Sequence, residues 1–217
     1  MTVTQTIVEE LVVKSRHRIK TYGEVFTPSH MVNQMLDLVH EELETGPDFV
    51  DKTFLEPAAG DGNFLIAILH RKLQALTAHY PPESWPTESL FALASIYGVE
   101  LLEDNHAAAK DAMLEEFGTF HTEHGVPCGP TTDLMQAATF LVDTNIICGN
   151  TLTSLDRRGE PIQFSWWNRV DGKPGIVLRE PFSLESLRGA HAFDFTVHES
   201  YEVCRIDHVH EEGRAGG

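Results

Sequence analysis

The sequence predicts an α/β fold with a mainly parallel sheet whose strands are connected by helices. Strand-like and helix-like segments alternate along the first two thirds of the 217-residue chain, a pattern typical of right-handed crossovers in parallel sheets. Residues 54–65 join a short apolar strand to a helix through the turn Gly60-Asp61-Gly62. Glu100 falls at the end of the next predicted strand, where such sheets collect functional side chains.

The elements of the first half follow from apolar spacing and turn residues. A helix is expected over residues 29–43, and a strand over 53–56 leads through the glycine turn into a helix over 63–73. Three prolines in residues 77–88 indicate a surface loop. A short helical piece and a strand over residues 95–101 follow.

In the second half, helices are expected over residues 105–117 and 132–141, separated by a Gly/Pro/His loop over 118–130. A third strand is expected over residues 145–148.

The C-terminal third has strand character in residues 162–167, 176–179 and 193–204. A turn over residues 171–175 and a short helix over 184–187 separate these segments.

Length and composition favour one domain over residues 1–217, without room for a second recognition domain. Residues 1–20 form a basic N-terminal segment and residues 211–217 a flexible tail. No apolar run reaches the ~18 residues of a membrane span, and the N-terminus lacks the apolar core of a signal peptide. We therefore expect a cytoplasmic protein without membrane contact.

The net charge limits the binding partners that we expect, and the cysteine content indicates the state of the thiols. The net charge of −17 argues against tight, sequence-independent DNA binding by the chain alone. One basic cluster precedes Phe26: Lys14, Arg16, His17, Arg18 and Lys20. It is either an ordinary solvated helix end or a surface that faces a polynucleotide. Three widely separated cysteines predict reduced thiols rather than disulfides.

Three motifs occur in a fixed order along the chain. They are Gly23-Glu24-Val25-Phe26-Thr27-Pro28, then Leu55-Glu56-Pro57-Ala58-Ala59-Gly60-Asp61-Gly62, then Gly98-Val99-Glu100. Over about residues 14–152 the chain resembles the adenine-specific DNA amino-methyltransferases of restriction-modification systems. The resemblance implies S-adenosylmethionine as cofactor and a Rossmann-like class I methyltransferase sheet. Fewer than seventy residues follow the third predicted strand, so we expect this sheet to be abbreviated at its C-terminal end.

The cofactor has groups that each need a partner. A carboxylate at the position of Glu100 is placed to accept both ribose hydroxyls, and Glu56 is placed to hold the methionine ammonium or a neighbouring donor. The resemblance implies that Thr27 contacts the methionine carboxylate. The full predicted cofactor-binding set is Phe26, Thr27, Pro28, Glu56, Pro57, Ala58, Gly60, Asp61, Gly62, Asn63, Glu100, Leu101, Asn150 and Thr151.

Asn150 stands where the family has an acid that binds the exocyclic amine of the cofactor adenine. Its amide oxygen can accept the same hydrogen bond with less charge assistance.

The family's catalytic Asn/Asp-Pro-Pro-Tyr/Phe sequence is absent. The Pro81-Pro82 pair precedes the second predicted strand, which is the wrong position. Where the catalytic loop should follow the third strand, the chain has Trp166, Trp167 and Asn168. These are the candidate catalytic residues, since two rings can stack on a flipped base and an amide can accept its hydrogens. The competing interpretation, which the pattern favours, is a strand whose aromatic side chains fill the core or an interface.

The expected loop over residues 118–130 contains three possible metal ligands. His121, His124 and Cys128 have ligand-like spacing, but no second ligand pair completes it. We therefore predict no metal site.

The leading interpretation is an S-adenosylmethionine-dependent methyltransferase acting on adenine in DNA, either with a protein partner or as a minimal modification enzyme. A catalytically silent cofactor-binding subunit, which supports or regulates an active methyltransferase, is one alternative. A methyltransferase with a protein or small-molecule acceptor is another, since a fold does not fix the acceptor.

Overall fold

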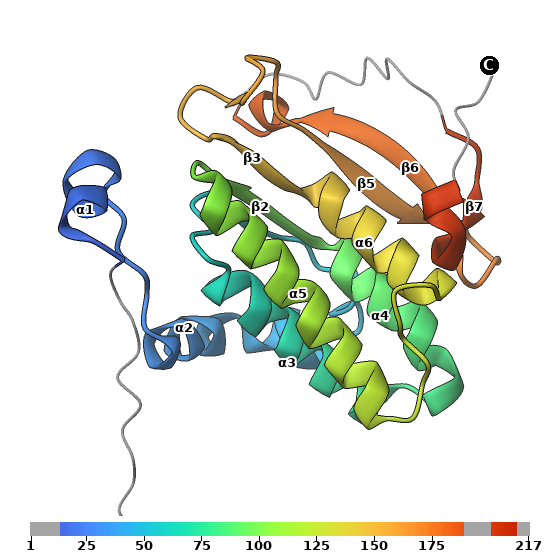
Figure 1. Cartoon of the computed structure of the whole chain (residues 1–217). Helices are drawn as coiled ribbons and strands as arrows, with labels where there is room; N and C mark the ends of the chain where they lie inside the picture. The colour runs from blue at the N-terminus through green and yellow to red at the C-terminus, as the bar shows by residue number, and fades with distance from the viewer. Residues whose placement is uncertain (1–13, 189–200, 212–217) are drawn as a thin grey trace, which may run out of the picture.

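The central feature of the fold is a four-stranded sheet, shown by a computed structural model that describes residues 14–188 and 201–211 (Figure 1). Its strands lie in the order β1 (Phe54–Glu56), β2 (Ile96–Glu100), β3 (Ile146–Asn150) and β4 (Leu155–Asp156). The first three strands are parallel and β4 is antiparallel to β3. The mixed α/β architecture expected from the sequence is confirmed, with a mixed rather than purely parallel sheet.

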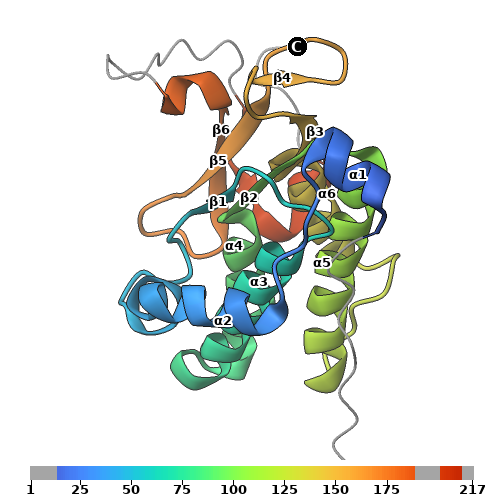
Figure 2. The same ribbon diagram turned by 90° about the vertical axis from the view of Figure 1, so that its left-hand side faces the viewer.

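Two helices connect each pair of neighbouring parallel strands. They are α3 (Asn63–His79) and α4 (Trp85–Ala94) between β1 and β2, then α5 (Glu103–Glu123) and α6 (Asp133–Asn145) between β2 and β3. Ile96 and Ile146 pack with buried residues of these helices in the larger hydrophobic core. The helices therefore cover one face of the sheet (Figures 1 and 2).

A second, antiparallel sheet covers the opposite face. It contains β5 (Gln163–Arg169), β6 (Ile176–Ser183) and β7 (Cys204–Arg205) in that order. Tyr97 of β2 packs against Phe164, Trp166 and Phe182 with ring centroids 5.5–5.8 Å apart. Its hydroxyl also donates a hydrogen bond to the carbonyl of Ser165 at 3.0 Å. The C-terminal strands thus form a separate layer instead of continuing the first sheet.

The N-terminal segment runs along the outside of this core. It contains α1 (Arg16–Tyr22), α2 (Ser29–Leu36), a 3₁₀ turn (Asp37–Val39) and a π turn (Glu41–Thr45). Val32, Leu36 and Leu43 are buried, which explains the apolar spacing expected over residues 29–43. No residue of α1 is buried, and α1 stands apart from the helical layer (Figure 1).

Lys72 links the residues that precede β1 to Ser95, which precedes β2. Its side chain is fully buried on α3, and its ammonium donates hydrogen bonds to the carbonyls of Val50 and Lys52 and to the hydroxyl of Ser95. Burial lowers the pKa of Lys72 to about 7. The contacts hold the segments that enter β1 and β2 side by side, and so fix the register at the start of both strands.

Some predicted boundaries were wrong. The helix α3 extends to His79 instead of ending at residue 73, and the expected loop over 77–88 contains the 3₁₀ turn Pro82–Ser84 and the start of α4. Residues 118–123 belong to α5 instead of a loop, because Phe120 and His121 are buried against neighbouring helices.

The C-terminal predictions have mixed outcomes. The strands near residues 162–167 and 176–179 are present and longer than expected, and the short helix is a 3₁₀ turn (Leu184–Leu187). Most of the strand expected over residues 193–204 lies outside the described residues, as does most of the tail 211–217. Another 3₁₀ element, Ile206–Glu211, ends the described chain.

Two global expectations can be compared with the described residues. None of the helices described is long and apolar enough to cross a membrane. Cys128, Cys148 and Cys204 are each only partly buried.

Candidate functional site

A cavity of about 250 Å³ lies at the carboxyl ends of the three parallel strands. Four chain segments supply its walls, which places residues far apart in sequence around one space. The lining residues are Tyr22, Gly23, Glu24, Val25, Phe26, Pro57, Ala58, Gly60, Glu100, Leu101, Leu102, Asn105, Gly149, Asn150, Thr151 and Leu152.

The glycine turn forms the floor between β1 and α3. Gly60 and Gly62 have φ angles of +59° and +101°, which favour residues without a Cβ atom. A Cβ on Gly60 would lie 3.2 Å from the Phe26 ring, and one on Gly62 would lie 3.0 Å from Ala109. The turn therefore fits closely against both the N-terminal segment and α5.

Glu100 supplies a buried carboxylate to the cavity. Its side chain accepts hydrogen bonds from the backbone N–H groups of Gly60 and Leu102, both at 2.8 Å, and the residue is 7% exposed. Oε2 accepts from Gly60 and keeps a second lone pair, whereas Oε1 also faces the side-chain amide of Asn105 at 3.4 Å. Glu100 can therefore hold the glycine turn and still accept hydrogen bonds from a ligand.

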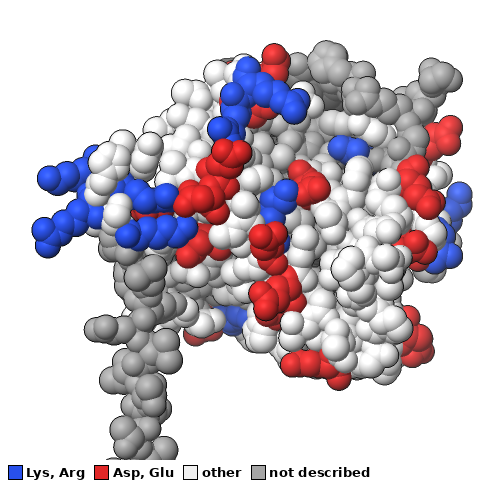
Figure 3. Space-filling view, viewed as in Figure 1, with Lys and Arg blue, Asp and Glu red and all other residues white. Residues whose placement is uncertain are grey.

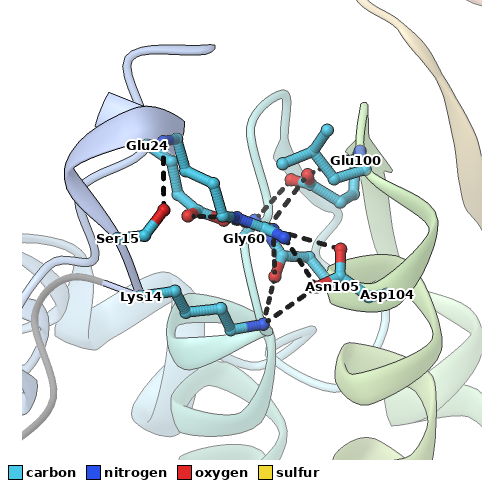
Figure 4. A network of polar contacts seen from close by, with 9 residues as sticks. Lys14, Ser15, Glu24, Gly60, Glu100, Asp104 and Asn105 are labelled. Atoms are coloured by element: carbon cyan, nitrogen blue, oxygen red, sulfur yellow. Dashed lines mark hydrogen bonds and ion pairs between the residues drawn. The ribbon is translucent and has the colours of Figure 1, made fainter. Parts of the chain in front are cut away.

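Glu24 supplies a second carboxylate, which the sequence interpretation did not include (Figure 4). Arg18 donates two hydrogen bonds of 2.6 Å to its two oxygens, and Asn105 donates a third at 2.7 Å. The hydrogen bond from Arg18 lowers the pKa of the Glu24 carboxyl. The cavity is thus lined by two carboxylates from different chain segments, both in contact with the side-chain nitrogen of Asn105.

Asn150 and Thr151 connect the end of β3 to the glycine turn. The amide oxygen of Asn150 accepts from the backbone N–H of Leu152 at 2.9 Å, and the Thr151 hydroxyl donates to the carbonyl of Pro57 at 2.5 Å. The second lone pair of the Asn150 oxygen is the acceptor left for a ligand.

The structure brings most of the predicted cofactor-binding residues together. Those that line the cavity are Phe26, Pro57, Ala58, Gly60, Glu100, Leu101, Asn150 and Thr151. Those outside its lining are Thr27, Pro28, Glu56, Asp61, Gly62 and Asn63.

Several of the residues outside the lining hold its walls. Asn63 donates from its side-chain amide to the carbonyl of Thr27 at 3.2 Å. The Glu56 carboxylate accepts from the backbone N–H of Ala58 at 3.0 Å. Glu56, expected to hold an ammonium group, therefore braces the turn in this structure.

Some lining residues were missed. Glu24 could have been found, because it belongs to the same short motif as Phe26. Asn105 carries no local signal, since its partners lie as far as 91 residues away in sequence.

Trp166, Trp167 and Asn168 lie away from this cavity. They line another cavity of about 230 Å³, together with Thr53 and Ser95, the residues that precede β1 and β2. This is the amino end of the strands, opposite the glycine turn. The contacts agree with the competing interpretation of an aromatic packing strand, and the geometry gives the catalytic assignment no support.

The basic cluster divides into two groups. Lys14 and Arg18 turn inward to Asp104 and Asn105. Arg16, His17 and Lys20 are exposed. Lys and Arg gather at the α1 end of the molecule, and acidic side chains spread over the adjoining face (Figure 3).

Two of the possible metal ligands, His121 and His124, have other contacts in the structure. The Nε2 atom of His121 lies 2.9 Å from the Ser89 hydroxyl, and the Nδ1 atom of His124 lies 2.7 Å from the carbonyl of Phe120. Within residues 14–188 and 201–211, no group of three or more His, Cys, Asp and Glu side chains is arranged to hold a metal ion.

Comparison with known proteins gave no match to a protein-family model, to a curated protein or to a solved structure.

Proposed function

We propose that the chain binds S-adenosylmethionine in the cavity at the carboxyl ends of β1, β2 and β3, as part of a methyltransferase that acts on adenine in DNA. In this proposal the parallel sheet is an abbreviated Rossmann-like class I methyltransferase sheet. Glu100 accepts the ribose hydroxyls, the glycine turn approaches the ligand, and Asn150 accepts from the adenine amine.

The charge of the cavity is the observation that carries the proposal. Its lining contains the carboxylate of Glu100 and that of Glu24, which is paired with Arg18 behind the lining, and no lysine or arginine among the described residues. A glycine turn before a helix commonly binds phosphate through free backbone N–H groups, but here Glu100 already accepts from the N–H of Gly60. These features disfavour a phosphate-bearing dinucleotide. They favour a nucleoside with hydroxyls and a cationic group.

The methyl acceptor and the partner are proposed from the sequence. Adenine in DNA is the acceptor that the motif resemblance implies, and a protein partner is proposed because the Asn-Pro-Pro-Tyr sequence is absent. A partner that contacts DNA would also offset the net charge of −17.

A second candidate function has one observation in its favour. Trp166, Trp167 and Asn168 lie at the opposite strand ends from the cavity, so these three residues do not replace the missing motif there. A cofactor-binding subunit that supports an active methyltransferase would need no such group.

Calorimetric titration with S-adenosylmethionine and S-adenosylhomocysteine tests the proposal. We expect both to bind, and Glu100→Ala to weaken binding about ten- to a hundredfold, the loss associated with charge-assisted hydrogen bonds. Glu103→Ala is the matched control, since Glu103 is an exposed carboxylate paired with Arg157 outside the cavity lining. The absence of binding by the wild-type chain, or equal effects of the two substitutions, would refute cofactor binding at this site.

Transfer of labelled methyl groups separates the two candidate functions. Labelling of adenine in DNA, by the chain alone or with a partner that is inactive alone, supports the methyltransferase. Cofactor binding without transfer, together with stimulation of a methyltransferase that is already active, supports the silent subunit.

A further inference from the structure

We infer that Asn105 is a positioning residue that couples closure of an N-terminal strap, residues 14–28, to the orientation of Glu100. The inference rests on the proposed function in one respect, namely that Glu100 accepts the ligand's hydroxyls. It adds that the ligand-binding carboxylate is oriented by a segment of chain far from it in sequence.

The strap forms one wall of the cavity but has little apolar attachment to the body. Tyr22 and Val25 are 50% and 58% exposed, and none of the residues of α1 is buried. Its apolar anchor at the cavity is Phe26, which is 6% exposed and packs against Gly60. Gly23, in the left-handed region at φ +69°, lets the chain turn between α1 and this anchor.

Polar contacts hold the strap against α5. The Arg18 guanidinium bridges the carboxylate of Glu24, at 2.6 Å, and that of Asp104, at 2.8 and 3.1 Å. We call the side chains of Arg18, Glu24, Asp104 and Asn105 the latch. Glu24 is only 6% exposed within it, so its ion pair with Arg18 is partly shielded from solvent and salt.

Asn105 has four hydrogen-bond partners, three in the strap and Glu100 (Figure 4). Its oxygen accepts from Lys14 at 2.5 Å and from Arg18 at 3.2 Å. Its nitrogen donates to Glu24 at 2.7 Å and to Glu100 at 3.4 Å. An amide has two donors and two acceptor sites, and this one divides them between the strap and the ligand-binding carboxylate.

The consequence is mechanical coupling through one buried side chain. Asn105 is 1% exposed with the strap closed. If the strap opens, the amide loses Arg18, Lys14 and Glu24 and can reorient toward water, because a long contact of 3.4 Å with Glu100 is all that is left of its four hydrogen bonds. That reorientation removes its bond to Glu100 and loosens a carboxylate that also holds Gly60 and Leu102.

Asn105→Asp breaks the coupling with almost no change of shape. The substitution puts a carboxylate in place of the amide donors that face Glu24 and Glu100. Hydrogen exchange of the ligand-free chain should then speed up about tenfold or more in the strap and also at the N–H groups of Gly60 and Leu102. Asn33→Asp, on the exposed surface of α2, is the control and should change neither.

Arg18→Ala attacks the latch from the strap side. Its side chain is 23% exposed, so its loss should leave the core folded even if Asn105→Asp unfolds the chain. The same joint acceleration is expected, with Lys20→Ala, an exposed cation on the same helix, as its control. Faster exchange in the strap with unchanged protection at Gly60 and Leu102 would overturn the inference.

Ligand discrimination supplies a readout that a merely structural role would not change. The wild-type chain should bind adenosine about tenfold more tightly than 2′,3′-dideoxyadenosine, which lacks the hydroxyls. The Arg18→Ala variant should lose this preference and keep its affinity for the dideoxy compound, because Arg18 lies outside the cavity lining, whereas equal losses for both nucleosides would contradict positioning. If the wild-type chain binds neither, the proposed function fails, and exchange at Gly60 and Leu102 alone decides the coupling.

Discussion

His121 is fully buried in α5, among the rings of Phe117 and Phe120, with the Ser89 hydroxyl 2.9 Å from its Nε2 atom. Burial lowers its pKa from 6.5 to about 4. The unfolded chain therefore binds a proton on this side chain at higher pH than the folded chain does. Between pH 6.5 and pH 4, the free energy of unfolding must fall as the pH is lowered.

We expect His121→Phe to remove this dependence, because phenylalanine fits the aromatic surroundings and does not titrate. The wild-type chain should lose about 2 kcal/mol more stability than the variant between pH 7 and pH 5. Urea unfolding at the two pH values measures the difference. His30→Gln, at an exposed position of α2, should lose as much as the wild type, and equal losses in wild type and His121→Phe would contradict the assignment.

Gly62 offers a second test at the residue scale. Its φ of +101° is outside the range common for side chains, and an added Cβ would lie 3.0 Å from the backbone of Ala109. Gly62→Ala should therefore lower the free energy of unfolding by about 1–3 kcal/mol through backbone strain, with overlap adding to it. Gly125→Ala, at φ +73° with nothing within 4 Å, should lose less. Equal losses measured by urea unfolding would show that α5 does not press on the glycine turn.

At the scale of elements, β5 belongs to the second sheet, which packs on the face of the first sheet opposite the helices. Trp166 stacks on Phe182 with centroids 4.1 Å apart, and Trp167 is 7% exposed beside Phe140 of α6. Asn168 is exposed and donates a hydrogen bond to Glu180 on the neighbouring strand. Trp167 therefore contributes to the hydrophobic core, whereas its neighbour Asn168 does not.

We expect Trp167→Ala to lower the free energy of unfolding by about 3–5 kcal/mol, and Asn168→Ala to change it little. Thermal and urea unfolding measure both effects. Because Asn168 is exposed, its replacement should leave the core intact. A loss of methyl transfer in this variant would then not result from a loss of stability. Abolished methyl transfer in a fully stable Asn168→Ala variant would revive the catalytic assignment of this strand.

Sequence patterns predicted those elements whose stability is local. The strand ending at Glu56, the glycine turn and α3 follow one another directly, while β2 ends at Glu100, one residue before the expected end, and β3 ends at Asn150, two residues beyond it. The end of α5 was missed because Gly118 and two histidines read as a loop, while burial of Phe120 and His121 prolongs the helix. The second sheet was missed as a layer because its position depends on packing against Tyr97, which lies 68 residues from its hydrogen-bond partner Ser165.

The candidate site was predictable to the same degree. Short motifs located the glycine turn and Glu100. The partnership of Glu24 with Asn105 spans 81 residues, and no spacing rule links residues that meet only after the sheet has formed.

At the scale of the whole molecule, charge opposes contact with DNA. The net charge is −17, and two cations of the N-terminal cluster, Lys14 and Arg18, are engaged by acidic and amide groups of α5. Arg16 and Lys20 are exposed. Few cations in that cluster are therefore free to replace the counterions of a duplex.

The isolated chain should bind duplex DNA only weakly at physiological salt, and methylate it slowly or not at all. Single-stranded DNA should be the better substrate, because no energy is spent on extruding the base. Fluorescence anisotropy with labelled duplex and single strands, followed by label transfer, measures both. Tight duplex binding that Arg16→Ala with Lys20→Ala leaves unchanged would contradict this account of the surface.

The order of strands in the first sheet is also their order in the chain. During translation, β2 can therefore dock beside β1 as soon as α3 and α4 have emerged from the ribosome, and β3 can dock beside β2 in the same way. No early strand waits for a late one to enter between its neighbours, so each new strand pairs with the strand before it, while β1 remains the opposite edge. A nascent chain built in this way spends little time with unpaired apolar strands, the species most prone to aggregate.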